Sequence, residues 1–220
     1  MFTDELLKAT GNIWSGYLKQ DFVKELGNGA LAEEKFRFYM VQDYLYLLQY
    51  AKVFALGVVK ANDEETMRYF ASMVHETLDD EMNIHKTYMA RLGITPEELT
   101  TTKTAFANQS YTSYMLDVSQ RGDILDVLVA VLSCAWSYEM IGAELAKIPN
   151  SKEHPFYGEW IVGYTSEGYV NSVVGLKEKV NALVEEVSPA RKDALTEMFV
   201  NCCKFEREFW NMSYTMDMGE

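Results

Sequence analysis

The chain has 220 residues, of which 48% are hydrophobic and 24% are charged, and its formal net charge at pH 7 is −13. This length suits one large domain or two small ones with a sizeable buried core. The negative charge argues against nucleic acid and anionic membrane surfaces as partners, because both require a basic face. Tyrosine accounts for 14 residues. Since buried tyrosine hydroxyls need hydrogen-bond partners, we expect a polar pocket within the core.

The chain carries no recognisable targeting or membrane segment. Its first residues, MFTDELLKAT, are charged and amphipathic, and the charge-free stretch VLVAVLSCAWSY has only 12 residues. A spanning helix needs about 20 apolar residues. The three cysteines, Cys134, Cys202 and Cys203, lack the spacing of a disulfide framework, which indicates a reducing compartment. We therefore expect a cytoplasmic protein without a membrane partner.

Helical periodicity runs through nearly the whole chain, and no alternating apolar stretch predicts a β-strand. In chain order, the pattern predicts helices over about 4–19, 33–61, 63–93, 104–120, 123–148, 155–187 (bent near Gly168) and 189–217, with shorter pieces before Gly29 and at 95–103. None of the four prolines falls inside a long helical pattern. The sequence predicts an all-α, single-domain helical bundle over residues 1–220.

Motifs for metal and phosphate chemistry are missing from the sequence. It has no Glu-x-x-His or His-Glu-x-x-His spacing, no glycine-rich phosphate loop and no Gly-x-Ser-x-Gly turn. Glu81 and His85 lie four residues apart, with Asp79 and Asp80 beside them. These ligands are too few for a metal site, and we expect a structural or surface role for them.

Asp43 lies in the most aromatic part of the helix predicted over 33–61, with Tyr39, Tyr46, Leu47 and Tyr50 on the same face. A buried carboxylate is costly unless it is hydrogen-bonded. Asp43 is therefore either bonded to tyrosine hydroxyls in the core or kept to bind a ligand, and its position alone favours neither.

Glu206 lies on the apolar stripe of the helix predicted over 189–217, between Cys202 and Cys203 on one side and Phe209 and Trp210 on the other. Such surroundings are expected to raise the pKa of a carboxyl, which suits proton donation near neutral pH. The alternative is a core glutamate paired with a cation.

Cys134, in the segment SCAWSYE, faces the core side of an apolar helix, with Tyr138 one turn later. A single cysteine in such a helix is usually an inert core residue. However, three long helices each place one reactive group on an apolar, aromatic face, and other helices add Tyr111, Tyr114, Tyr164 and Tyr169. A nucleophile, an acid and a carboxylate among aromatic rings suit a flat, hydrogen-bonding heterocycle.

Four segments together resemble the TenA family, also called thiaminase II: FRFYMVQDYLYL (36–47), EMNIHKTYMARLGI (81–94), SCAWSYEMIG (133–142) and FEREFW (205–210). The resemblance covers essentially the whole chain, with the motifs in the same order. It implies an all-α, haem-oxygenase-like fold, a homotetramer, and neither haem nor metal as cofactor. It also implies hydrolysis of aminopyrimidines in thiamin salvage, cleavage of thiamin into pyrimidine and thiazole, or both.

The resemblance also assigns roles to individual residues. Cys134 matches the nucleophile that adds to the pyrimidine ring, and Glu206 matches the acid/base. Asp43 matches the carboxylate that reads a ring nitrogen and the exocyclic amine, and Tyr138 the phenol beside the cysteine. The positions that stack on the ring or hydrogen-bond to it are matched by Tyr46, Tyr111 and Tyr164. Glu81 and His85 fit a family motif that we interpret as structural, bridging helices.

Other function classes compete with this hypothesis. A non-catalytic or regulatory pyrimidine-binding protein on the same fold would keep the pocket, but it would not need the thiol of Cys134. A di-metal oxidase would need the Glu-x-x-His spacing that the sequence lacks. A purely structural bundle would not bury carboxylates on aromatic faces.

Overall fold

The computed structural model describes residues 1–219, apart from the side chain of Asp80, and contains no β-strand within that range. This confirms the all-α fold. The helical elements are α1 (Phe2–Ala9), α2 (Asn12–Gly16), η1 (Tyr17–Lys19), α3 (Asp21–Asn28), α4 (Glu33–Lys60), α5 (Glu64–His75), η2 (Glu76–Glu81), α6 (Met82–Arg91), α7 (Pro96–Thr101), α8 (Phe106–Arg121), α9 (Ile124–Leu145), α10 (Gly158–Tyr164), α11 (Glu167–Leu183) and α12 (Pro189–Thr215).

The chain forms two compact units, each assembled from separate stretches of sequence. The first unit comprises Met1–Leu31 and Leu128–Asn211, and the second comprises Ala32–Val127 and the C-terminal segment from Met212. Most of α9 and α12 therefore belongs to the first unit, whereas α4 to α8 belong to the second. The single domain over residues 1–220 stays a prediction.

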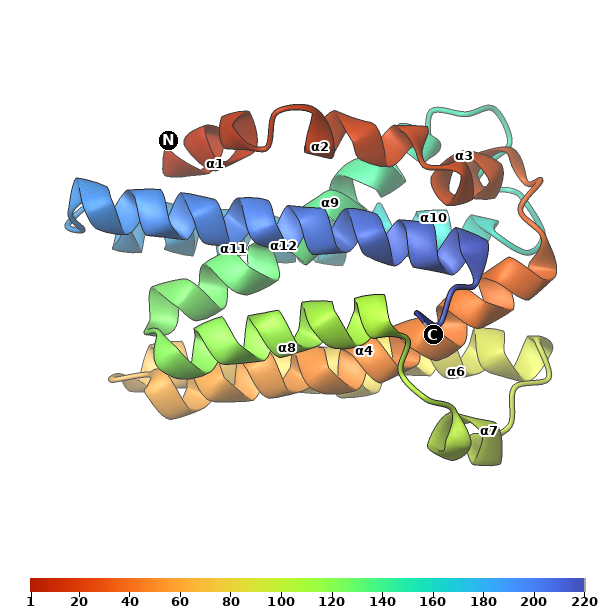
Figure 1. The fold of residues 1–220 in the computed structure, drawn as a ribbon, viewed down its shortest axis with the longest axis horizontal. Helices are drawn as coiled ribbons and strands as arrows, with labels where there is room; N and C mark the ends of the chain where they lie inside the picture. The colour runs from red at the N-terminus through yellow and green to blue at the C-terminus, as the bar shows by residue number, and fades with distance from the viewer. Residues whose placement is uncertain (220) are drawn as a thin grey trace. The chain divides into compact units, whose positions relative to one another are not determined.

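The second unit is organised around α4, which packs against α5, η2, α6 and α8. Figure 1 shows α8 running alongside α4. Glu33 and Glu34 in the first turn of α4 and Lys60 in its last turn complement the helix dipole. At Gly57 the ring of Phe70 lies so close that an added Cβ would sit 2.3 Å from its Cδ1 atom, so this contact requires glycine. The close fit fixes α5 against α4.

The first unit has its most apolar helix in α9. With 22 residues and a mean hydropathy of 1.7 in its most apolar window, α9 could span a membrane by length and composition. However, 72% of that window is buried inside the protein. Burial of this kind is typical of a core helix, and it places Cys134 on a well-packed element.

Two of the predicted helices are wrong as single helices. The helix expected over 4–19 is divided into α1, α2 and η1, because Gly11 adopts a φ of 55° between the first two. The helix expected over 155–187 is divided into α10 and α11, and the break falls before Gly168. At that break Ser166 caps α11, its hydroxyl oxygen accepting a hydrogen bond from the backbone N–H of Tyr169. The helix expected over 63–93 is interrupted by the π-helical turn η2 between α5 and α6. The other long helices are confirmed to within a few residues at their ends.

Candidate functional site

In the second unit, a hydrogen bond joins two buried ionisable side chains, Asp43 of α4 and His85 of α6. Their exposed fractions are 3% and 4%, and His85 Nε2 lies 2.6 Å from Asp43 Oδ2. The other ring nitrogen, Nδ1, lies 3.0 Å from the carbonyl oxygen of Glu81. Asp43 is therefore bonded to a histidine, and not to tyrosine hydroxyls as one of the two alternatives had it. His85 links α6 to α4, as the structural interpretation of Glu81 and His85 expected.

The segment before His85 departs from regular α-helix. Residues Glu76–Glu81 form the π-helical turn η2 between α5 and α6. A π-turn holds more residues than an α-turn, so it changes which residues of the following helix face a neighbour. Glu81 is the last residue of η2, and its carbonyl oxygen is the one that His85 Nδ1 contacts. The π-turn thus ends at the residue that orients the imidazole.

The pKa of His85 lies above its usual value of 6.5. Burial, the largest influence, lowers it, but the hydrogen bond and negative charge of Asp43 and the charge and carbonyl of Glu81 together outweigh burial. An imidazolium held by a carboxylate on one side and a carbonyl on the other is therefore favoured.

Two of the predicted ligand-binding tyrosines, Tyr46 and Tyr111, are in ring contact with each other. Tyr46, one turn after Asp43, and Tyr111 of α8 are buried, and their ring centroids lie 5.4 Å apart at an interplanar angle of 42°. The hydroxyl of Tyr46 lies 3.7 Å from the sulfur of Met115. The structure thus joins Tyr46 to Tyr111, whereas the contact that it shows for Asp43 is with His85.

A buried amide pair beside these residues was not found in the sequence. The side chain of Gln42 accepts from the backbone N–H of Ala105 at 2.9 Å and donates to the carbonyl of Lys103 at 3.1 Å. Asn108 Nδ2 donates to the backbone carbonyl of Gln42 at 2.7 Å. These bonds attach the start of α8 to the turn of α4 that carries Asp43. Gln42 and Asn108 are uncharged and form no motif by which to recognise them, so the sequence alone did not indicate that they would be bonded to each other's helices.

In the first unit, Cys134 and Tyr138 of α9 are 8% and 4% exposed, and Glu206 of α12 is 1% exposed. The ring of Tyr138 lies 4.8 Å from that of Tyr164 and 5.1 Å from that of Trp210, between centroids. The predicted site residues of this unit are therefore buried in an aromatic cluster.

Tyr17 of η1 is a further buried residue of the first unit that sequence reasoning missed. Its buried hydroxyl donates to the carbonyl of Cys203 at 2.8 Å. The pKa of Tyr17 is raised well above its usual value of 10, first by burial and then by the neighbouring Cys203 and Glu206, with a smaller contribution from Cys134.

The adjacent thiols of α12 differ from Cys134 in their burial. Cys202 and Cys203 are fully buried, and burial raises the pKa of Cys202 to about 12 and that of Cys203 further still. Both therefore remain protonated near neutral pH and are poor nucleophiles, because the thiolate is the reactive form.

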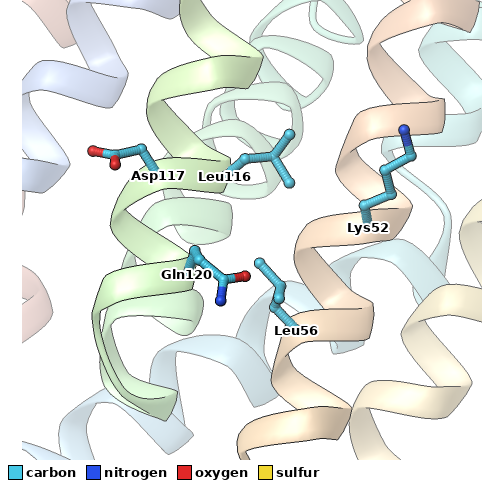
Figure 2. A pocket seen from close by; sticks show the side chains of 5 residues that line it. All are labelled: Lys52, Leu56, Leu116, Asp117 and Gln120. Carbon is cyan, nitrogen blue, oxygen red and sulfur yellow. The ribbon is translucent and has the colours of Figure 1, made fainter.

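One surface pocket of the second unit is not lined by any of the predicted residues. Figure 2 shows this pocket of about 390 Å³ beside α4 and α8, with Leu56 and Leu116 directed between the two helices and Asp117 directed away. Its lining comprises Lys52, Leu56, Leu116, Asp117 and Gln120. Asp43, Tyr46 and Tyr111 do not line it. We give more weight to the buried polar chemistry than to this open depression, because the depression has few converging polar groups.

The side chains of the described residues include no group of three or more His, Cys, Asp or Glu residues arranged to hold a metal ion. The side chain of Asp80, considered above with Glu81 and His85, lies outside the described part of the chain.

Residues 7–216 match the TENA/THI-4/PQQC family. The chain is 42% identical over 217 residues to the aminopyrimidine aminohydrolase of Halalkalibacterium halodurans, an alignment that covers 99% of this chain and 97% of that protein. It is 45% identical over 203 residues to the aminopyrimidine aminohydrolase of Helicobacter pylori, covering 92% and 94% of the two chains.

Solved structures agree with this relationship. A TenA homologue from P. horikoshii OT3 superposes with a TM-score of 0.90 at 28% identity, covering 98% of this chain and 99% of that one. A Shewanella denitrificans domain with a heme oxygenase-like fold superposes with a TM-score of 0.76 at 16% identity, covering 97% and 92%, which shows the fold alone. The predicted fold class and family resemblance are confirmed, and the chain belongs to the TENA/THI-4/PQQC family.

Proposed function

We propose that this protein is a hydrolase of thiamin salvage that acts on aminopyrimidines. It would release the hydroxymethylpyrimidine from an aminomethylpyrimidine, cleave thiamin into pyrimidine and thiazole, or do both. The proposal rests on the match of residues 7–216 to the TENA/THI-4/PQQC family, in a chain whose Cys134 and Glu206 are both buried. The two aminopyrimidine aminohydrolases to which the chain is 42% and 45% identical support the same class of substrate.

In the proposed reaction, the thiolate of Cys134 forms a bond to a carbon of the pyrimidine ring, and Glu206 delivers a proton to a ring nitrogen. The ring electrons then expel the substituent on the exocyclic methylene, as ammonia from the protonated aminomethyl compound or as the thiazole from thiamin. Water adds to that methylene and releases a proton to solvent, the carbon–sulfur bond breaks to return the thiolate, and Glu206 recovers its proton from the ring nitrogen. The net change is replacement of the leaving group by hydroxyl, and it consumes one water molecule.

The remaining predicted residues would bind the ring. Asp43 would read a ring nitrogen and the exocyclic amine, and Tyr138 would orient the sulfur of Cys134 from the next helical turn. Stacking or hydrogen-bonding roles are assigned to Tyr46, Tyr111 and Tyr164. The burial of all three tyrosines supports this assignment, because rings in fixed positions suit a flat ligand. A homotetramer in the cytoplasm, with no metal or other cofactor, completes the proposal.

The test follows pyrimidine products by chromatography from thiamin and from the aminomethylpyrimidine, with native enzyme and with Glu206→Gln. Native enzyme should form the hydroxymethylpyrimidine, and the larger kcat/KM identifies the preferred substrate. Glu206→Gln should bind the pyrimidine but lose turnover by about 100-fold or more, the contribution of a positioned acid. If the native enzyme forms product from neither compound, the non-catalytic binding protein becomes the better explanation. Unchanged turnover in the variant removes Glu206 from the mechanism.

A further inference from the structure

We infer that His85 is a positioning residue that holds and orients the carboxyl of Asp43, so that this carboxyl selects a pyrimidine bearing an amino group. The inference rests on the proposed function, in which Asp43 contacts the ring, and it adds a determinant of specificity outside the predicted ligand-binding residues. His85 acts through Asp43.

The hydrogen bonds of His85 determine where its protons lie. A carbonyl oxygen only accepts, so Nδ1, at 3.0 Å from Glu81 O, carries a proton. The second ring nitrogen, Nε2, shares one proton with Asp43 Oδ2 across 2.6 Å. The pair is therefore either imidazolium and carboxylate or neutral imidazole and carboxylic acid. The charged groups that act on His85 are Asp43 from α4 and Glu81 from η2, and both favour the imidazolium.

The bond to His85 determines which oxygen of Asp43 can recognise a ligand. That bond uses Oδ2. The other oxygen, Oδ1, is a hydrogen-bond acceptor that the bond to His85 does not use. Asp43 is held at 3% exposure, so an acceptor left without a donor on ligand binding would be costly. An exocyclic amino group supplies that donor, whereas hydrogen at the same ring position does not.

The experiment measures dissociation constants by calorimetry for two ligands at pH 6 to 9. One ligand is the hydroxymethyl-aminopyrimidine product, and the other is its analogue with hydrogen in place of the amino group. His85→Gln can still donate to Asp43 from the position of Nε2 but carries no titrating proton. His85→Asn can donate only from the position of Nδ1, toward Glu81. His75→Gln serves as the matched control, because His75 forms an exposed pair with Asp79 at 2.5 Å.

Native protein and the His75 control should prefer the amino ligand by about 10- to 100-fold, the worth of a hydrogen bond to a charged group. This preference should weaken as the pH rises through the raised pKa of His85. In His85→Gln the preference for the amino ligand should persist without that pH dependence. In His85→Asn the ratio of the two dissociation constants should fall toward unity, while the hydroxymethyl-aminopyrimidine still binds.

A structural role alone predicts a different result. If both variants lose thermal stability but keep the native preference and its pH profile, the inference is overturned. Failure of the proposed function is a separate outcome. A native protein that discriminates through His85 but forms no product would sustain the inference and contradict the hydrolase. A native protein that turns over substrate, but whose ligand preference does not depend on His85, would sustain the hydrolase and contradict the inference. A native protein that binds neither ligand would contradict both the hydrolase and the inference.

Discussion

Replacing Gly57 with alanine tests the packing that fixes α5 on the helix bearing Asp43. The new Cβ would lie 2.3 Å from Cδ1 and 2.5 Å from Cγ of Phe70, a ring with no exposed surface. Carbon atoms normally approach to about 3.5 Å, so the ring or the helix must shift by about 1.2 Å. Overpacking of this kind costs about 1–3 kcal/mol, and the better helix propensity of alanine returns up to about 1 kcal/mol.

Gly175→Ala provides the matched control, because Gly175 is also helical but an added Cβ there meets no atom within 4 Å. This control should gain up to about 1 kcal/mol. The free energies of unfolding of the two variants, measured by urea denaturation followed by circular dichroism, should therefore differ by about 1–3 kcal/mol, with Gly57→Ala the less stable. Equal stabilisation by both substitutions would refute the close contact between α4 and α5.

The remaining predictions concern the histidine pair and a helix end. Because the pKa of His85 is raised on folding, its charged form stabilises the protein fully below about pH 6.5, and this contribution is lost as the pH rises through the folded-state pKa. The stability difference between native protein and His85→Gln, from urea titrations at several pH values, should therefore shrink at alkaline pH, and a constant difference would contradict the ion pair. Gly29→Ala should destabilise more than Gly93→Ala in thermal unfolding. Both have positive φ, at 76° and 65°, but only the first would place a Cβ 2.6 Å from the ring of His154. Equal losses would indicate that backbone strain alone decides.

Periodicity and helix-terminating residues predicted most of the fold. The long helices were recognisable because their apolar residues recur at helical spacing and no proline interrupts them. The wrong boundaries were local. Gly11 does not stand out within an amphipathic stretch, yet its positive φ ends α1. Ser166 is not distinguished in the sequence from the other serines, although in the structure it caps the start of α11. Such choices depend on backbone angles that the residue pattern does not specify.

The candidate site was predictable where an ionisable group stands on an apolar face. Asp43, Cys134 and Glu206 were found in this way, and all three are buried in the structure. Their partners could not be found by the same reasoning. His85 lies 42 residues from Asp43 and Tyr17 lies 186 residues from Cys203, and such contacts are set by tertiary packing. Within one sequence, no pattern connects residues so far apart.

The central claim is that Cys134 is the nucleophile of an aminopyrimidine hydrolase. The most direct measurement is the rate of hydroxymethylpyrimidine release by native enzyme, Cys134→Ser and Cys202→Ala, run side by side. Cys202 is a matched control because it is also a buried thiol of the first unit, but one whose pKa is raised to about 12. We predict that Cys134→Ser loses turnover while still binding the product, and that Cys202→Ala retains it. Full activity in Cys134→Ser would contradict the account and return Cys134 to the role of a core residue.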